Sequence, residues 1–349
     1  MPSLFDPLKV GDLTLPNRIV MAPLTRCRAG TQRMPNELMA QYYRQRAGAG
    51  LIVSEATSVT PMGVGYAGTP GVWSEEQVAG WKLTTQAVHA AGGRIFLQLW
   101  HVGRISDPSF LDGRPPVAPS AIAAQGNVSL LRPERPFPLP RALAVEEIPG
   151  VIEAYRQGAR NAQAAGFDGV EIHGANGYLL DQFLQDRANH RTDGYGGGIA
   201  NRARLMLEVV DAVTSVWGAG RVGMHLAPRG DSNTMGDSDP GALFGHVVRE
   251  LGRRQLAFLC VREYAAADSI GPKLRSVFGG VYIANERFTP DSAALAVAAG
   301  EVDAVAFGKL FIANPDLPRR MQPGAALNAP DVPGFYAGGA KGYTDYPSF

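Results

Sequence analysis

The stretch of the chain best equipped for chemistry is 170–180, where an apolar run gives way to polar side chains. His173 stands at the end of the run, and Asn176 and Tyr178 follow within a glycine-containing turn. Imidazole and amide N–H groups can both donate hydrogen bonds to one developing oxyanion, and a phenol nearby can deliver a proton. These three residues are our candidate catalytic set, although a histidine at a strand end is as commonly a structural residue with internally satisfied hydrogen bonds.

A candidate phosphate site lies near the end of the chain, where Gly308 and Lys309 follow the last strand-like run. A glycine lets backbone N–H groups approach a phosphate closely, and the lysine adds a positive charge. Asn285, at the end of the preceding run, stands where its main chain could take part. The alternative is a tight strand-to-helix turn with a surface lysine.

The G-x-G-x-x-G pattern at 63–68 is not interpreted as a dinucleotide fingerprint. Pro70 and Gly71 follow it, so no helix can begin there and face a pyrophosphate. We expect instead a flexible loop above the barrel, from which Tyr66 reaches the substrate.

These residues need a scaffold, and the chain repeats one pattern throughout: a short apolar run that ends on a polar or small residue. Such runs, each expected to be a buried parallel strand, occur at 19–25, 51–57, 94–101, 169–174, 222–228, 256–262, 281–286 and 304–309. Helices are expected at 75–91, 148–165, 201–217 and 289–299, with N-caps at Ser74 and Thr289. This alternation predicts an α/β fold, a (β/α)8 TIM barrel, because a doubly wound sheet would need fewer strands.

The segment 107–141 is the longest insertion in this pattern and is rich in proline. Because it follows the third strand, we expect it to lie over the carboxyl-terminal mouth of the barrel as a lid or binding loop. An inert surface excursion is the alternative. No linker divides the chain, so we expect a single domain over 1–349.

At the carboxyl ends of the predicted strands, where barrel enzymes assemble their active sites, the side chains are mostly amides, imidazoles and other hydrogen-bonding groups. In chain order they are Thr25, Ala56, Gln98, Trp100, His173, Asn176, Tyr178, His225, Arg262, Asn285, Gly308 and Lys309. There is no carboxylate cluster and no His/Cys set at metal-ligand spacing, so catalysis by a metal ion is not expected. The set suits a neutral heterocycle that carries a phosphate.

Bulk composition excludes several function classes. Lys+Arg 33 against Asp+Glu 32 leaves a net charge of +1 over 349 residues, whereas a nucleic-acid or membrane-surface partner would need a concentrated basic face. Cys27 and Cys260 are too few for a four-cysteine zinc or iron–sulfur site. Two reduced thiols and the lack of a signal-like or membrane-spanning run are typical of a cytoplasmic protein.

Several motifs, in the right order and nearly from end to end, resemble those of the Old Yellow Enzyme family. They are PNRIVMAPLTR at 16–26, SEAT at 54–57, LQLWHVGR at 97–104, EIHGANGYLLDQFL at 171–184, RTDGYGG at 191–197 and ANPDL at 313–317. The chain looks most like the bacterial xenobiotic reductases, which act on nitroesters, nitroaromatics and activated alkenes. The resemblance implies a non-covalent FMN over the barrel mouth, reduced by NADPH or NADH and reoxidised by an electron-poor alkene.

The resemblance also implies roles for individual residues. In the family, residues matching Pro23, Leu24, Thr25, Ala56 and Gln98 contact the flavin, and those matching Tyr66, Trp100 and Tyr336 shape the substrate cavity. Residues matching His173 and Asn176 hold the carbonyl or nitro oxygen of the substrate. Hydride passes from flavin N5 to the β-carbon of the alkene, and the tyrosine matching Tyr178 protonates the α-carbon.

Two positions depart from the family pattern. Many members have an arginine near flavin N1 where His225 stands, and a histidine is charged only at lower pH. We expect His225 still to contact the flavin, with Arg229 nearby. Many members also have an arginine in place of Lys309, so phosphate binding would depend more on backbone amides. Thr25, in place of a cysteine, sets the chain apart from the thermophilic-type branch.

Three other functions compete with this one. Relatives that couple flavin to an iron–sulfur cluster need a run of cysteines that this chain lacks. A non-redox barrel enzyme would need a catalytic lysine or carboxylate, for which Lys309 is the sole candidate, and a non-catalytic flavin-binding protein would not need His173, Asn176 and Tyr178 together. The physiological substrate, the choice of NADPH or NADH, the stereochemistry, and the choice between monomer and homodimer stay open.

Overall fold

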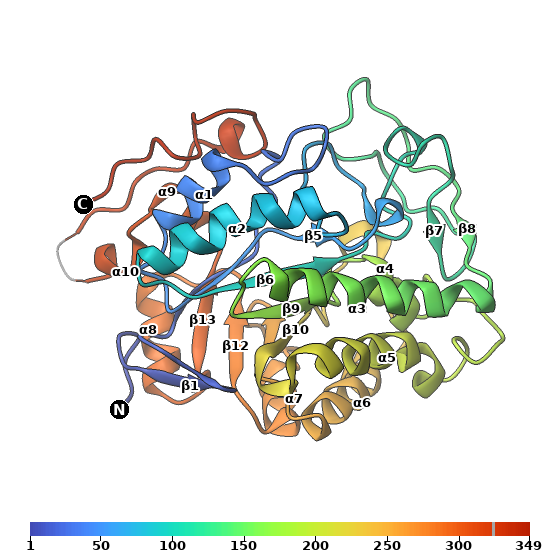
Figure 1. The fold of residues 1–349 in the computed structure, drawn as a ribbon. Coiled ribbons are helices and arrows are strands. Elements are labelled where there is room, and N and C mark those ends of the chain that lie inside the picture. The colour runs from blue at the N-terminus through green and yellow to red at the C-terminus, as the bar shows by residue number, and fades with distance from the viewer. Residues whose placement is uncertain (323–324) are drawn as a thin grey trace.

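The computed structural model describes residues 1–322 and 325–349, which form a closed barrel of parallel strands surrounded by helices (Figure 1). Around the barrel the strands run in the order β4-β3-β13-β12-β11-β10-β9-β6, and pairing of β4 with β6 closes the ring. Their bounds are β3 Ile19–Met21, β4 Leu51–Val53, β6 Ile95–Trp100, β9 Gly169–His173, β10 Val222–Leu226, β11 Phe258–Arg262, β12 Tyr282–Asn285 and β13 Ala304–Phe307. The predicted (β/α)8 TIM barrel is confirmed.

Most strands are shorter at their ends than the sequence pattern suggested. The run at 19–25 forms a strand only over Ile19–Met21, and the run at 51–57 divides into β4 and the two-residue β5, Thr57–Ser58. Most residues of the parallel ladder are buried and β-branched or apolar, and polar residues such as Gln98, His173 and His225 also pair in it. A proline such as Pro23 has no N–H to donate to the ladder. The polar residues that follow are left in loops at the carboxyl ends, where they can line a site.

Helices cover the outside of the barrel, and α2, α3 and α5 lie side by side across the face that Figure 1 presents. The α-helices are α1 Glu37–Arg44, α2 Glu75–Ala90, α3 Ile148–Ala164, α4 Leu179–Leu184, α5 Ile199–Trp217, α6 Pro240–Arg253, α7 Gly271–Phe278, α8 Pro290–Ala298, α9 Lys309–Ala313 and α10 Leu317–Arg320. The expected N-caps are confirmed, because the side chain of Ser74 accepts from the Gln77 N–H and that of Thr289 from the Ser292 N–H. Capping of this kind satisfies N–H groups that lack a partner within the helix.

The lower part of the barrel interior is filled by side chains, so no cofactor can enter there. Phe96 and Phe258 pack with ring centroids 5.9 Å apart. Gly223 makes room for them, because a Cβ at that position would lie 2.1 Å from Phe258 Cζ. The N-terminal hairpin, β1 Leu8–Val10 and β2 Leu13–Leu15, packs against the same interior cluster. Within the barrel, space for a site is therefore left at the carboxyl ends of the strands.

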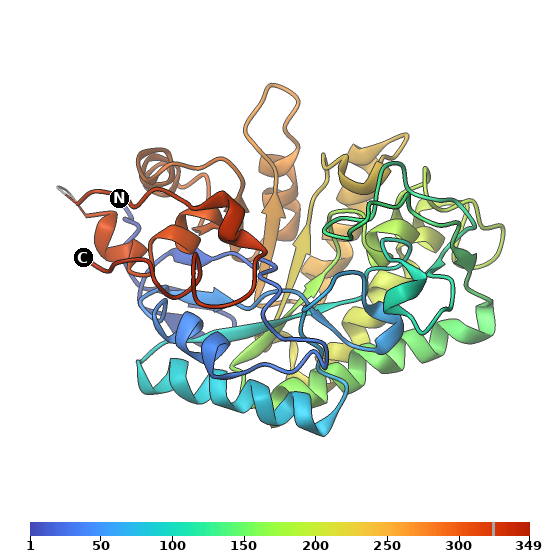
Figure 2. The same ribbon diagram turned by 90° about the horizontal axis from the view of Figure 1, so that it is seen from above.

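The carboxyl-terminal mouth is flanked by the insertion 107–141 on one side and by the C-terminal segment on the other, green and red in Figure 2. In and beside the insertion, the short strands β7 Val117–Ala118 and β8 Arg141–Ala142 pair in parallel. Short 3-10 helices complete the loops: η1 Pro61–Gly63, η2 Pro108–Phe110, η3 Val145–Glu147, η4 Ala219–Arg221, η5 Ser232–Thr234 and η6 Val332–Phe335. Buried Arg26 and Arg28 anchor the C-terminal segment by donating to its backbone carbonyls.

Candidate active site

The predicted site residues converge on a small cavity of about 100 Å³ at the carboxyl ends of the strands. Nine of them line it: Pro23, Thr25, Ala56, Gln98, Trp100, His173, Asn176, Tyr178 and His225. They come from the ends of β3, β4, β6, β9 and β10 and from the loops that follow. Barrel closure therefore brings together residues spread over most of the chain.

The turn after β9 aims Asn176 and Tyr178 at this cavity. Asn176 and Gly177 both have left-handed backbone conformations, with φ of 59° and 77°, which asparagine and glycine adopt more readily than other residues. Buried Asp181 accepts a hydrogen bond from the Gly177 N–H at 2.8 Å, and Gln182 donates to the Gly177 carbonyl at 2.7 Å. Because α4 begins directly after Tyr178, the turn is held between a strand end and a helix start.

His173 and His225 are both neutral at physiological pH. Burial, together with the neighbouring His225 and Arg262, holds the pKa of His173 well below its usual range. Burial and then Arg262 lower the pKa of His225 to about 3. The Nδ1 atoms accept hydrogen bonds from the Ala175 backbone N–H and from Gln98 Nε2, at 3.4 and 3.3 Å. In each ring Nε2 therefore carries the hydrogen and serves as a donor.

The phenol of Tyr178 lies against aromatic rings and a second phenol. Its ring meets those of Trp100 and His173 edge to face, with centroids 4.9 and 5.0 Å apart. Its hydroxyl lies 2.9 Å from the hydroxyl of Tyr66. Burial raises the pKa of Tyr178 to about 12, an effect that the hydrogen bond from Tyr66 opposes. Tyr178 is therefore a protonated acid with a partner that can stabilise the phenolate.

A second cavity of about 320 Å³ continues outward from the first, with Thr25 and Tyr178 in both. The remaining wall is formed by Tyr66, Ser129, Leu130 and Tyr336. Ser129 and Leu130 belong to the insertion, and Tyr336 belongs to the C-terminal segment. The three residues predicted to shape the substrate cavity all line this pair of cavities: Trp100 lines the inner one, and Tyr66 and Tyr336 line the outer one.

Beneath the inner cavity lies a buried carboxyl group that the sequence pattern did not single out. Gln98 Nε2 donates to Glu171 Oε1 at 2.7 Å, and burial raises the pKa of Glu171 to about 8. Glu171 Oε2, Trp100 Nε1 and His225 Nε2 are buried and have no hydrogen-bond partner among the described residues. Such orphaned polar atoms are costly unless a bound group satisfies them.

The predicted phosphate residues lie together but apart from both cavities. Asn285 and Ala306 are paired across β12 and β13, and Asn285 Nδ2 donates to the Ala306 carbonyl at 2.8 Å. A Cβ on Gly308 would lie 3.3 Å from Leu24 Cδ2, which places the glycine directly beside the loop after β3. Lys309 is exposed at the start of α9. Their role toward phosphate stays a prediction.

Arg229, expected near His225, turns away from the site. It binds Asp268 at 2.6 Å and Glu263 at 3.6 Å, and it lies over the ring of Tyr264. The arginine that does reach the site is Arg262, at the end of β11, which donates to Asn176 Oδ1 at 2.8 Å. The sequence predicted that Arg262 ends a strand, but it gave no indication that Arg262 pairs with Asn176.

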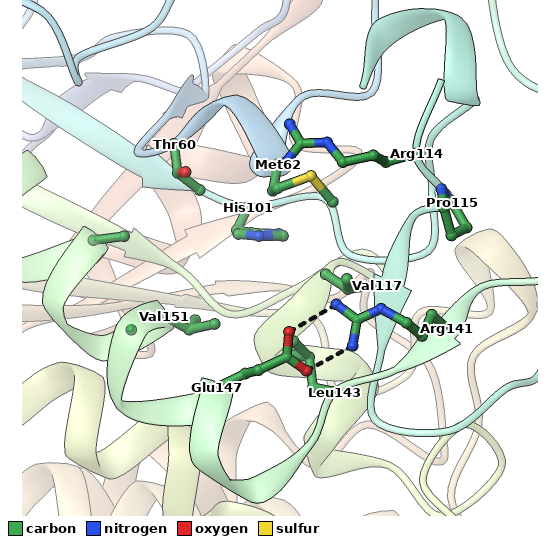
Figure 3. Close-up of a pocket in the computed structure, with 12 residues that line it drawn as sticks. Thr60, Met62, His101, Arg114, Pro115, Val117, Arg141, Leu143, Glu147 and Val151 are labelled. Atoms are coloured by element: carbon green, nitrogen blue, oxygen red, sulfur yellow. Dashed lines mark hydrogen bonds and ion pairs between the residues drawn. The ribbon is translucent and has the colours of Figure 1, made fainter. Parts of the chain in front are cut away.

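A larger cavity, of about 390 Å³, lies elsewhere (Figure 3). Its walls come from η1, the base of the insertion and the start of α3, and along one side of it Arg141 and Glu147 form a two-point ion pair at 2.6 and 2.8 Å. His101 lines this cavity, whereas its neighbour in sequence, Trp100, points to the other side of the chain and lines the inner cavity. The reactive side chains gather in the smaller cavity, so we assign the chemistry there.

Two kinds of feature are absent from residues 1–322 and 325–349. No group of three or more His, Cys, Asp or Glu side chains in these residues could hold a metal ion. No helix among them is both long enough and apolar enough to cross a membrane.

Comparison with known proteins places the chain in one family. Residues 3–328 match the NADH:flavin oxidoreductase / NADH oxidase family. A probable flavin mononucleotide-dependent alkene reductase of Leishmania infantum is 44% identical over 353 residues, covering 99% of this chain and 97% of the relative. Among solved structures, an Old Yellow Enzyme homologue from Zymomonas mobilis has a TM-score of 0.97 at 45% identity, covering 99% of both chains. Morphinone reductase in complex with tetrahydroNAD has a TM-score of 0.96 at 49% identity, covering 100% of this chain and 98% of that one.

These matches run over almost the whole chain and agree with the barrel fold. A closer likeness to the xenobiotic reductases stays a prediction. The chain therefore belongs to the NADH:flavin oxidoreductase / NADH oxidase family, that of the Old Yellow Enzymes, and is an FMN-dependent oxidoreductase.

Proposed function

We propose that this protein is an NAD(P)H-dependent ene-reductase that reduces the carbon–carbon double bond of alkenes activated by a carbonyl or nitro group. Maleimides, α,β-unsaturated carbonyls and nitroalkenes are the expected substrates, with nitroesters and nitroaromatics as further candidates. One observation carries the proposal: neutral N–H donors of His173 and Asn176 and the acidic hydroxyl of Tyr178 share one cavity. That combination suits a substrate with a hydrogen-bond acceptor at one end and a carbon to be protonated nearby.

The residues around the inner cavity fit FMN. His225 Nε2 is a buried donor without a partner in the described residues, and it faces a cavity shared with Thr25 and Gln98, which suits the polar edge of a flavin. Pro23, Leu24 and Ala56 would provide apolar contacts, and Asn285, Gly308 and Lys309 would hold the phosphate. Bound FMN would take hydride from NADPH or NADH and supply it to the β-carbon of the alkene.

The protein's own residues would perform the rest of the reaction. His173 and Asn176 would hold the carbonyl or nitro oxygen and stabilise the negative charge that develops on it, which dipoles do best in a site that excludes water. Tyr178 would protonate the α-carbon, and the hydroxyl of Tyr66, 2.9 Å away, would stabilise the phenolate left behind. Trp100, Tyr66 and Tyr336 would confine the substrate between the donors and the acid.

The insertion 107–141 would act as a lid within a single barrel domain. Ser129 and Leu130 at its tip already line the outer cavity, opposite Tyr336 of the C-terminal segment. A lid in this place would shape the space available to the alkene and exclude water during the reaction. We therefore expect substitutions at Leu130 to change substrate preference more than they change flavin binding.

The direct test is spectroscopic. The purified protein, supplied with FMN, should show flavin absorbance that bleaches when NADPH or NADH is added under anaerobic conditions. Absorbance should return when 2-cyclohexenone or N-ethylmaleimide is added, and the saturated product should be detected. A protein that binds no FMN, or one whose reduced flavin is not reoxidised by any activated alkene, would exclude the proposed function.

A further inference from the structure

We propose that Arg262 is a positioning residue for the substrate anchor: it fixes the amide of Asn176 so that the amide N–H groups face the substrate oxygen. The proposal rests on the proposed function, in which Asn176 holds that oxygen. Arg262 does not line either cavity of the site, so its effect would pass through Asn176.

The first support is the chemistry of the contact. Arg262 Nη1 donates to Asn176 Oδ1 at 2.8 Å. An arginine side chain has only donors, so it can pair with the oxygen of an amide but never with its NH₂ group. The flip that exchanges the two ends of an asparagine amide is therefore unfavourable here. With Oδ1 bound by Arg262, the NH₂ group of Asn176 is left to bind an acceptor in the inner cavity, which Asn176 lines.

The second support is that both partners are themselves held in place. Glu286 binds Arg262 at two points, Oε2 to Nε at 2.7 Å and Oε1 to Nη2 at 3.4 Å. Asn233 Nδ2 donates to the backbone carbonyl of Asn176 at 2.8 Å. Two-point binding of a guanidinium by a carboxylate restricts its orientation. Glu286, Arg262 and Asn176 thus form a chain of contacts from the end of β12 through β11 to the turn after β9.

The third support concerns charge. His173 and His225 are neutral, so neither contributes a positive charge to the anchor. Arg229 is paired with Glu263 and Asp268 away from the site. Burial chiefly lowers the pKa of both histidines, and the nearby positive charge of Arg262 lowers it further. A charge-assisted hydrogen bond to Oδ1 polarises the amide and makes its N–H groups better donors toward a developing oxyanion.

A double-mutant cycle tests this inference. Arg262→Met, Asn176→Ala and the double variant are prepared as FMN-loaded proteins, because methionine keeps an unbranched apolar stem of similar length. Two quantities are measured: the Kd of 4-hydroxybenzaldehyde, a carbonyl ligand without a reducible alkene, from the change in oxidised flavin absorbance, and the rate at which 2-cyclohexenone reoxidises the reduced flavin. We expect Arg262→Met alone to weaken both about tenfold, the effect of losing a hydrogen bond to a charged group. In the Asn176→Ala background the same change should have less than about a twofold effect.

The matched control is Arg229→Met, which removes an arginine that is likewise paired with carboxylates but does not touch the site, and it should leave both quantities unchanged. An equal loss from Arg262→Met in both backgrounds, or no loss in the wild-type background, would overturn the inference while leaving the proposed function intact. If Asn176→Ala itself has no effect, the anchor assigned in the proposed function is wrong, and the inference fails with it. Should Arg262→Met not fold, Arg262→Leu, which likewise has no donor for Asn176 Oδ1, is put through the same cycle and judged by the same two criteria.

Discussion

Replacing Tyr178 by phenylalanine should separate the two halves of the catalytic cycle. The substitution removes one hydroxyl and keeps the ring that packs against Trp100 and His173, at centroid distances of 4.9 and 5.0 Å. The cavity should therefore keep its shape. What is lost is the proposed acid for the α-carbon, together with its hydrogen bond to Tyr66.

The size of the effect follows from the acid and its surroundings. Burial raises the pKa of Tyr178 to about 12, which still makes it a far stronger acid than water. A positioned general acid contributes about 10²–10⁴ in rate, which is about 3–5 kcal/mol of barrier. We therefore expect alkene-dependent reoxidation of the flavin to slow by about 10²–10⁴ in Tyr178→Phe.

The assay is anaerobic stopped-flow spectroscopy of each half-reaction. Bleaching of the flavin by NADPH needs no proton from Tyr178 and should change little. Reoxidation by 2-cyclohexenone should show the full loss, and reoxidation by a quinone, which has less need of a positioned acid, should show a smaller one. A parallel fall in the reductive and oxidative rates would refute the role of Tyr178 as proton donor.

Tyr66→Phe provides a graded comparison. It leaves the proposed acid in place but removes the hydroxyl 2.9 Å from it, which would stabilise the phenolate as the proton leaves. Loss of one hydrogen bond to a developing charge predicts about a tenfold slower reoxidation, between the wild type and Tyr178→Phe. A loss in Tyr66→Phe larger than that in Tyr178→Phe would mean that Tyr66, not Tyr178, delivers the proton.

Three further substitutions test the site at other points. Lys309→Ala should weaken FMN binding about threefold to fivefold, because an exposed charge pair contributes little; unchanged affinity in a fluorescence titration of the apoprotein would remove Lys309 from the phosphate site. His225→Leu should weaken FMN binding about tenfold through loss of the Nε2–H donor, and because burial lowers the pKa of His225 to about 3, wild-type affinity should be flat from about pH 6 to 8. Burial raises the pKa of Glu171 from 4.5 to about 8, so folding favours its protonated form; its contribution to stability is present below pH 4.5 and is lost as the pH rises through 8. The Tm of the wild type should thus fall relative to that of Glu171→Gln over this range, and parallel Tm profiles would contradict the raised pKa.

Much of the scaffold could be predicted from local sequence. Runs of buried residues alternating with amphipathic stretches indicated a barrel, and the capping residues Ser74 and Thr289 marked two helix starts correctly. Other helices were not predicted, although α6 begins with a capping Asp239 before Pro240, a signal that was present. The six-residue α4 is too short for its periodicity to be recognised. Its place is set by the turn before it and by packing against α5.

The sequence also allowed the residues at the strand ends to be assigned to one site, because in a parallel barrel the carboxyl ends of all strands lie at the same mouth. For this reason the positions of His173, Asn176, Tyr178 and His225 along the chain were enough to group them, and the four side chains line one cavity. The sequence therefore determined the fold class and the nine residues that line the inner cavity.

Only the tertiary structure decided how those residues are paired and charged. Tyr66 meets Tyr178 and Arg262 meets Asn176 across separations of 112 and 86 residues, and such contacts depend on strand register and loop path, which no local pattern encodes. The sequence likewise does not reveal protonation states, because an imidazole or a carboxyl group can be neutral or charged according to its burial and its neighbours in space. His225 is neutral because the closed barrel buries it, and the positive charge beside the anchor comes from Arg262, on the neighbouring strand.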